Sequence, residues 1–350
     1  MAVYTAINDP SAYFQAQLYT GNASTNTITN GGNSNLQPDW VWVKARNLSG
    51  KDNVLYDSTR GVNKQIYTNN TNAQDSVSNG LTSFNTDGFT LGDNGGPNAS
   101  GNYVSWQWKA NGGTTASNSN GTITSTVQAN TTAGFSIISY TGNGTNGATI
   151  GHGLSETPQI FFPKCLSTTT NWEMYYFPTG GTKQYGYLNL TNAFATWSYT
   201  APTSTTIGLS GSGDSNGNGR SMIGYAFHSV QGYSKIGTFT GNGSTDGPFI
   251  YTGFKPAFGI FKRTNTTGNW YVMTGQIGDD GQNGNPLEDR LLANTTDAEG
   301  DMGAGYEFLS NGVKITHSGG EINGNGDTFL YMLFAESPFV TSDSVPTTAR

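Results

Sequence analysis

The chain has 350 residues and a formal net charge of −7, with 11% charged residues and 49 glycines. Its 16 basic residues are scattered, which excludes a nucleic-acid groove built from clustered Lys and Arg. No apolar run reaches the roughly 18 residues that a membrane-spanning helix needs, and one cysteine excludes a disulfide framework. High glycine content with 18 Phe, 18 Tyr and 7 Trp predicts a folded all-β protein rather than a disordered one.

A Tyr/Phe-Thr-Gly-Asn phrase occurs three times and defines three repeated segments. It ends the strand-like runs 14–20, 135–141 and 234–240. The Gly-Asn step indicates a turn, because both residues tolerate positive φ. A period of about 100–120 residues predicts three units of folding. They are segment 1 (residues 1–112, with a short N-terminal arm), segment 2 (113–230, including a linker) and segment 3 (231–350, with a short C-terminal tail).

Five further elements follow in chain order within each segment. A second strand ends in a lysine, at Lys44, Lys164 and Lys262. A third element carries Asn171-Trp172 and Asn269-Trp270, whereas segment 1 has Asn53-Val54. A fourth apolar and Asn-rich phrase occupies 66–73, 188–193 and 292–298. A short turn and strand then occupies 87–91, 206–209 and 311–315. The closing strand, with aromatics two residues apart on one face, occupies 101–108, 219–227 and 326–334.

These elements predict three tandem β-sandwich repeats of the jelly-roll or concanavalin-like kind, and the strand order within each sandwich stays open. Segments 1 and 2 are joined by a polar linker at 111–121, whereas the join at 229–233 is short. We therefore expect segments 2 and 3 to pack as a rigid pair, with segment 1 more loosely attached.

Repetition also separates scaffold from site, because a feature shared by all segments is best explained by folding. The shared lysines, Trp172 and Trp270 are therefore interpreted as structural, and a lysine at a strand end also blunts edge-to-edge pairing. Features of single segments are the candidates for recognition. Tyr185 and Tyr187, in a Tyr-Gly-Tyr loop, are the candidate ligand-binding residues. They either stack on a sugar ring or cover the edge of the core.

Two oxygen-rich loops begin at Asp214 and at Asp279. The first matches the opening of a calcium loop, yet its twelfth position is Tyr225 instead of the expected Glu. Whether either loop holds calcium stays open. His152, His228 and His317 are solitary, and no pair of carboxylates recurs at matching strand positions. The sequence therefore predicts no catalytic residue, no metal site and no cofactor.

Once the segments are aligned, the chain resembles a repeat family of virion structural proteins of tailed bacteriophages, notably marine ones. The resemblance depends on the following motifs: Tyr140-Thr141-Gly142-Asn143-Gly144 with His152-Gly153-Leu154, Gly253-Phe254-Lys255-Pro256-Ala257 with Lys262-Arg263, Gly268-Asn269-Trp270, and Phe334-Ala335-Glu336-Ser337-Pro338-Phe339. It covers residues 14–339, and the tail at 344–350 looks like endings of phage structural proteins. It implies concanavalin-like sandwiches and a place on the virion, without catalytic residues to carry over.

We therefore expect a non-enzymatic virion component, a tail-fibre or tail-tip protein that serves in adhesion or as a spacer. A capsid decoration protein on the head surface and a carbohydrate-binding receptor module are the alternatives, and a polysaccharide depolymerase ranks last. The expected partners are other virion proteins, further copies of the chain (a trimer first) and a host cell-surface glycan, with no nucleic acid and no membrane insertion. The start of the chain has no basic and apolar leader, so we expect assembly in the host cytoplasm.

Overall fold

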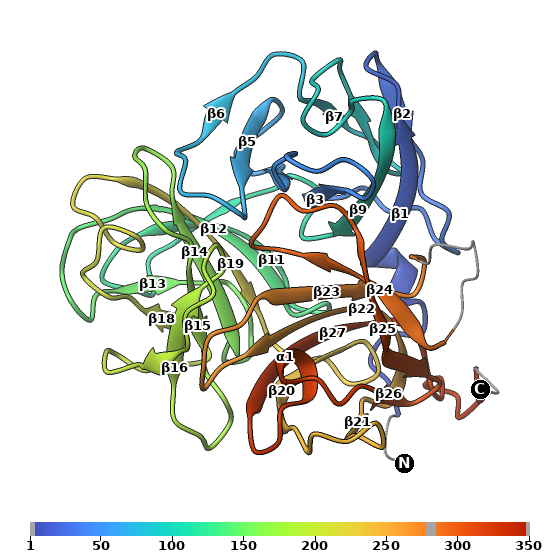
Figure 1. Ribbon diagram of the computed structural model, residues 1–350. Coiled ribbons are helices and arrows are strands. Elements are labelled where there is room, and N and C mark those ends of the chain that lie inside the picture. Colours follow the sequence, from blue (N-terminus) through green and yellow to red (C-terminus); the bar gives the residue numbers. More distant parts are fainter. Residues whose placement is uncertain (1–3, 278–284, 348–350) are drawn as a thin grey trace.

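The computed structural model describes residues 4–277 and 285–347 (Figure 1). Strands hold 44% of the residues and helices 2%, which confirms the all-β prediction. The two helical elements of the described residues are the 3-10 turn η1 (Pro10–Ala12) and α1 (Gly320–Asn323). No helix among the described residues is long and apolar enough to cross a membrane.

Segment 1 contains a six-stranded sheet with the order β1-β9-β3-β4-β5-β6 and a three-stranded sheet with the order β2-β8-β7. Its strands are β1 (Phe14–Gly21), β2 (Asn26–Ile28), β3 (Trp40–Ala45), β4 (Val54–Asp57), β5 (Lys64–Tyr67), β6 (Asp75–Ser76), β7 (Leu81–Phe84), β8 (Phe89–Leu91) and β9 (Gly101–Trp108).

Segment 2 contains an eight-stranded sheet with the order β10-β11-β12-β19-β14-β15-β16-β17 and the pair β13-β18. Its strands are β10 (Ala116–Asn118), β11 (Ser125–Asn130), β12 (Phe135–Thr141), β13 (Thr149–Gly151), β14 (Ile160–Cys165), β15 (Glu173–Tyr176), β16 (Gln184–Tyr187), β17 (Ala195–Thr196), β18 (Thr206–Gly208) and β19 (Ser221–Phe227).

Segment 3 forms one eight-stranded sheet with the order β20-β27-β22-β23-β24-β25-β26-β21. Its strands are β20 (Ser234–Thr240), β21 (Phe249–Tyr251), β22 (Phe254–Arg263), β23 (Trp270–Thr274), β24 (Leu287–Leu292), β25 (Gly300–Leu309), β26 (Gly312–Ile315) and β27 (Thr328–Pro338).

The main sheets share one strand order that the sequence left open. In each segment the closing strand lies between the first and second strands, as in β1-β9-β3, β12-β19-β14 and β20-β27-β22. Each main sheet is therefore assembled from the two ends of its segment. A smaller separate sheet accompanies the main sheet in segments 1 and 2, whereas all eight strands of segment 3 belong to one sheet, and the fold is β-sandwich-like.

A reciprocal asparagine pair explains the thrice-repeated Thr-Gly-Asn phrase. The backbone N–H of the phrase asparagine donates to a fully buried asparagine before the closing strand: Asn22 to Asn98 at 3.0 Å, Asn143 to Asn216 at 2.9 Å and Asn242 to Asn323 at 2.9 Å. Each buried side chain donates back to the phrase asparagine. The pair thus fastens the first turn to the loop that leads into the closing strand.

The glycine of the phrase is required for a reason other than the one predicted. Gly21, Gly142 and Gly241 do not adopt positive φ. A Cβ at these positions would lie 2.0–2.3 Å from a backbone carbonyl oxygen of that same loop, far inside van der Waals contact. Close backbone approach, not left-handed geometry, therefore selects glycine.

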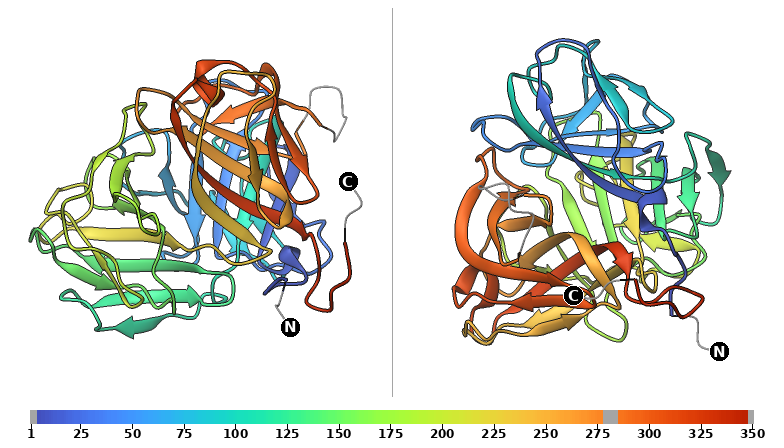
Figure 2. Two further views of the ribbon diagram at one scale, coloured as in Figure 1. Left: turned by 90° about the horizontal axis from the view of Figure 1, so that it is seen from below. Right: turned by 90° about the vertical axis from the view of Figure 1, so that its right-hand side faces the viewer.

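The three segments share a central hydrophobic cluster, and each segment also has a buried cluster of its own. A single cluster of buried side chains contains Trp108 of segment 1, Phe227 of segment 2 and Phe334 of segment 3. The segments lie around this centre in Figures 1 and 2, with segment 1 in blue and cyan, segment 2 in green and segment 3 in orange and red. The expectation that segment 1 is loosely attached is therefore wrong, because its central tryptophan contacts aromatic rings of both other segments.

Two local predictions are also corrected. The stretch predicted as a polar linker contains β10, and β11 follows it, so part of the linker is an edge of the segment 2 sheet. The fourth shared phrase is mostly a loop, because β5, β16 and β24 end at Tyr67, Tyr187 and Leu292. Its polar residues supply acceptors between segments, as described below.

Candidate functional site

The shared lysines join the segments into a closed ring. They lie on β3, β14 and β22, which are interior strands, and at most 1% of each side chain is exposed. Each ammonium donates at 3.1 Å to a threonine carbonyl of another segment: Lys44 to Thr295, Lys164 to Thr71 and Lys262 to Thr191. Burial lowers the pKa of all three to about 8. The three lysines are structural, as predicted. They do not blunt sheet edges, because the strands that carry them lie inside their sheets.

The third shared element forms a second set of bonds in the same direction around the ring. The indole N–H of Trp172 donates to the Tyr67 carbonyl at 2.6 Å, and that of Trp270 donates to the Tyr187 carbonyl at 2.9 Å. Segment 1 has no tryptophan here, and the Asn53 amide donates to the Ala293 carbonyl at 2.9 Å instead. Asn53 thus supplies in segment 1 the bond between segments that a tryptophan supplies in segments 2 and 3, and the ring stays closed.

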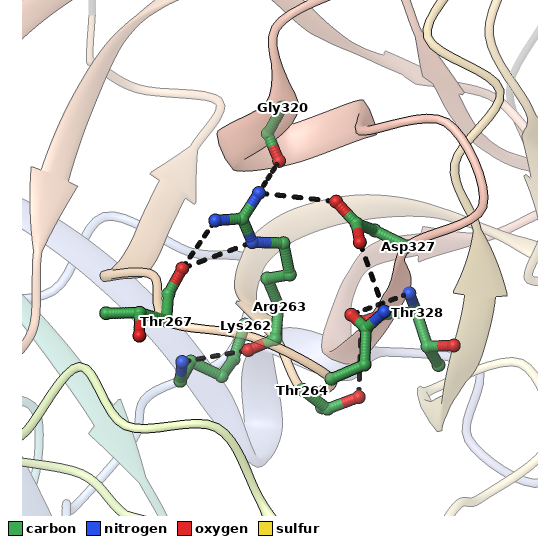
Figure 3. Close-up of polar contacts among 8 residues, drawn as sticks. Lys262, Arg263, Thr264, Thr267, Gly320, Asp327 and Thr328 are labelled. Carbon is green, nitrogen blue, oxygen red and sulfur yellow. Dashed lines mark hydrogen bonds and ion pairs between the residues drawn. The ribbon is translucent and has the colours of Figure 1, made fainter.

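The pair Lys262-Arg263, the longest basic run, is used within the scaffold (Figure 3). The Arg263 guanidinium donates to the carbonyls of Thr267 and Gly320 and pairs with Asp327 at 3.2 Å. These contacts join the loop after β22 to α1 and to the start of β27 (Figure 3). The arginine holds local structure and is not a free cationic site.

The middle of the Asp214 loop, residues 215–217, is buried, whereas residues 218 and 219 are exposed. The Asp214 carboxylate accepts the backbone N–H of Asn171 at 2.9 Å, and Asn216 is the buried partner of the Asn143 turn. Among residues 4–277 and 285–347, no group of three or more His, Cys, Asp or Glu side chains is placed to hold a metal ion. Asp279 and most of its loop lie outside the described residues.

Glu173 is the most deeply buried of the isolated glutamates. Only 3% of it is exposed, and its carboxylate accepts hydrogen bonds from the Tyr175 hydroxyl at 2.8 Å and the Ser212 hydroxyl at 3.1 Å. Burial raises its pKa. These donors belong to the interior of segment 2, so the arrangement stabilises a core and presents no face to a substrate.

His152 is a buried, neutral histidine that stabilises a loop. Its Nδ1 accepts the backbone N–H of Leu154 at 3.1 Å, which leaves Nε2–H to donate to the Thr203 carbonyl at 3.2 Å. Burial lowers its pKa to about 4. A second proton at Nδ1 would replace the bond from Leu154 by a repulsive contact between two donors.

His152 should make the folded protein sensitive to acid between about pH 6.5 and 4. In this window the unfolded chain binds a proton that the folded chain excludes, so stability falls as pH falls, by up to about 3 kcal/mol. Urea unfolding at pH 7.5 and 4.5 measures this loss, and His152→Gln should lose less. An equal loss in both proteins would contradict the prediction.

Tyr185 and Tyr187 lie on the strand β16 and not in a loop as predicted, and both are half-buried. Their ring centroids are 6.2 Å apart in an edge contact, and Tyr185 also packs near Trp197 at 6.5 Å. Trp197 in turn contacts Tyr199, which is 38% exposed. The structure thus brings the two candidates into one aromatic cluster, in which Tyr199 is the most accessible ring.

A second exposed aromatic pair was not predicted from the sequence. Phe249 and Tyr251 on β21 are 46% and 57% exposed, and the Lys235 ammonium lies 5.7 Å from the Tyr251 ring centroid. The corresponding positions are Thr27 and Thr29 in segment 1 and Thr149 and Gly151 in segment 2. Comparison of the segments at this strand would have found the pair.

The fold and its junctions define an all-β protein in which three like segments close a ring around one core. The chain belongs to the family described as a domain of unknown function (DUF7483), whose model matches residues 9–338. One family model therefore spans all three segments, in agreement with their shared core. Comparisons with curated proteins and with solved structures gave no match.

Proposed function

We propose that the protein is a non-enzymatic structural component of a bacteriophage virion, a tail-fibre or tail-tip protein that acts in adhesion or as a spacer. One observation carries the proposal: the lysines common to all segments are buried and donate to carbonyls of another segment. A ring closed in this way is a rigid block. Such a block suits a particle part better than a catalyst that must open and close.

The finer fold assignment belongs to this proposal. We take the three segments to be concanavalin-like or jelly-roll sandwiches, supported by the strand order that their main sheets share. The partners are other virion proteins and further copies of the chain, with a trimer expected first. Assembly takes place in the host cytoplasm.

Electron microscopy of virions from the encoding phage, labelled with a gold-conjugated antibody against the purified chain, tests the proposal. We expect label at the tail. Label spread over the head would favour the alternative of a capsid decoration protein. Absence of the chain from purified virions by mass spectrometry would contradict both. Release of reducing sugars from host polysaccharide, lost on mutation of a carboxylate, would contradict the non-enzymatic assignment.

Carbohydrate recognition is the second candidate, favoured by the aromatic cluster of Tyr185, Tyr187 and Tyr199. Flat aromatic faces suit the apolar faces of sugar rings. We expect binding on a glycan array to be lost in Tyr199→Ala, which keeps the packing of the half-buried Tyr185. Tyr4→Ala, at another exposed tyrosine, is the control. Binding that survives both Tyr199→Ala and the double variant Tyr185→Ala, Tyr187→Ala rules out this cluster.

A further inference from the structure

A groove of about 390 Å³ runs along one edge of β1, where segment 1 meets segment 3. One wall is the loop 31–33, in which the Gly32 N–H donates to the Gln15 side chain at 2.8 Å. The other wall is formed by Ala257 and residues 335–337 of segment 3. Four successive residues of β1, 14–17, also line it, so the groove follows the backbone of the strand.

Among the described residues, no strand lies beside this edge of β1. β1 is the terminal strand of its sheet and pairs with β9 alone. The Lys109 N–H donates to the Tyr13 carbonyl at 2.9 Å, so odd-numbered residues direct their backbone groups at β9. The N–H and C=O groups of Phe14 and Ala16 therefore face the groove.

The same edge in segment 2 is covered. There β11 pairs antiparallel with β12 over six residues, from Ser125 opposite Tyr140 to Asn130 opposite Phe135. Phe135 and Phe14 are matching first residues of the two first strands. Segment 2 therefore carries an added strand at the position where segment 1 has a groove.

The junction between segments 1 and 3 also resembles the junction between segments 2 and 1 in the residues that flank the strand position. In segment 2, Gln128 of β11 accepts the N–H of Asn111, three residues after Trp108, at 3.2 Å. The counterpart of Asn111 in segment 3 is Ser337, three residues after Phe334, which lines the groove. Its hydroxyl is buried and has no hydrogen-bond partner among the described residues.

The wall of the groove formed by loop 31–33 also has a counterpart in segment 2. Val127 and Ala129 of β11 pack over Gly153, where a Cβ would lie 3.0 Å from each side chain. Gly153 follows the buried Ile150 by three residues, and Gly31 follows the buried Ile28 by three residues. At the third junction the edge is closed by the chain itself, because the Ile236 N–H donates to the Ser229 hydroxyl at 3.0 Å. The groove along β1 therefore corresponds to the place that β11 occupies beside β12, but no described strand fills it.

We propose that this groove binds an extended segment of a partner polypeptide, which adds to β1 as an antiparallel strand. β11 defines the chemistry of that segment: uncharged, with small apolar residues toward loop 31–33 and Gln or Asn toward segment 3, as in its Val-Gln-Ala-Asn sequence. Main-chain bonds to the β1 edge supply affinity, and the alternating side chains supply specificity. The charged groups at the rim, Glu336 and Lys255, pair with each other at 3.0 Å.

A synthetic peptide with the sequence of residues 121–131, labelled with a fluorophore, tests the site by anisotropy with the full chain. We expect saturable binding that Gly31→Val weakens at least about tenfold, because Gly31 lines the groove and a larger side chain there takes space from the added strand. Gly95→Val is the matched control, since Gly95 faces open space in the same segment. A peptide methylated at the nitrogen of its Gln should fail to bind, because the N–H of the matching residue, Gln128, faces β12. Methylation at its Val, which faces away, should leave binding intact.

Displacement of β11 from its own place on β12 would also give binding, but Gly31→Val would then have no effect. That result would overturn the proposal, as would absence of binding at millimolar peptide. Loss of saccharide binding in Gly31→Val, with no peptide bound by the parent chain, would assign the groove to a glycan and also overturn it.

Discussion

Asp57→Ala should lower the free energy of unfolding by about 3–5 kcal/mol, because it leaves a buried guanidinium without its carboxylate. Asp57 is fully buried, and 4% of the Arg60 side chain with which it pairs is exposed. Its carboxylate also accepts the Tyr225 hydroxyl at 2.7 Å, a bond between segments 1 and 2. The substitution thus removes the acceptor of the Arg60 guanidinium, the Arg60 backbone N–H and the Tyr225 hydroxyl at a junction between segments.

Urea unfolding followed by circular dichroism measures this change. Asp246→Ala is the matched control: Asp246 also pairs with a cation, Lys314, but its side chain is 91% exposed. Solvent screens such a pair, so the control should unfold close to the parent. A loss below about 1 kcal/mol in Asp57→Ala would show that the buried cluster contributes little to stability.

Trp108→Ala should cost about 3–5 kcal/mol and weaken all three segments together. The Trp108 ring contacts Trp40 of its own segment at 4.4 Å between centroids. It also contacts Phe227 of segment 2 at 6.4 Å and Phe334 of segment 3 at 5.5 Å. The cavity left by the substitution would therefore lie where the segments meet, and no single segment could close it.

The experiment measures the cooperativity of unfolding of Trp108→Ala as well as its free energy of unfolding. Unfolding of Trp108→Ala should remain one transition by fluorescence and by circular dichroism, shifted to lower urea. Tyr251→Ala removes an aromatic ring that is 57% exposed, and it should stay within about 0.5 kcal/mol of the parent. A transition that splits, with segments 2 and 3 unfolding as in the parent, would contradict a shared core.

The structure agrees with the interpretation that the lysines shared by all segments are structural, and it adds the partners to which they bond. Lys44, Lys164 and Lys262 were correctly set aside as structural, but their partners could not be predicted. Lys44 bonds to a carbonyl 251 residues away, and such a contact leaves no periodic pattern in the sequence. The candidates Tyr185 and Tyr187 show the same limit. Alternation along a strand predicts that two side chains share a face, but not that Trp197 packs near Tyr185 on that face.

The amino-acid sequence by itself determined the all-β class, the three segments and the position of the first, second and closing strands. These features follow from alternation, turn residues and repetition, which act over a few residues or recur at a fixed period. Only the tertiary structure decided that the segments share one core, that buried lysines close the ring, and that β1 has an open edge where β12 is covered. Each of these depends on surfaces brought together from distant parts of the chain, and local sequence does not specify which surfaces meet.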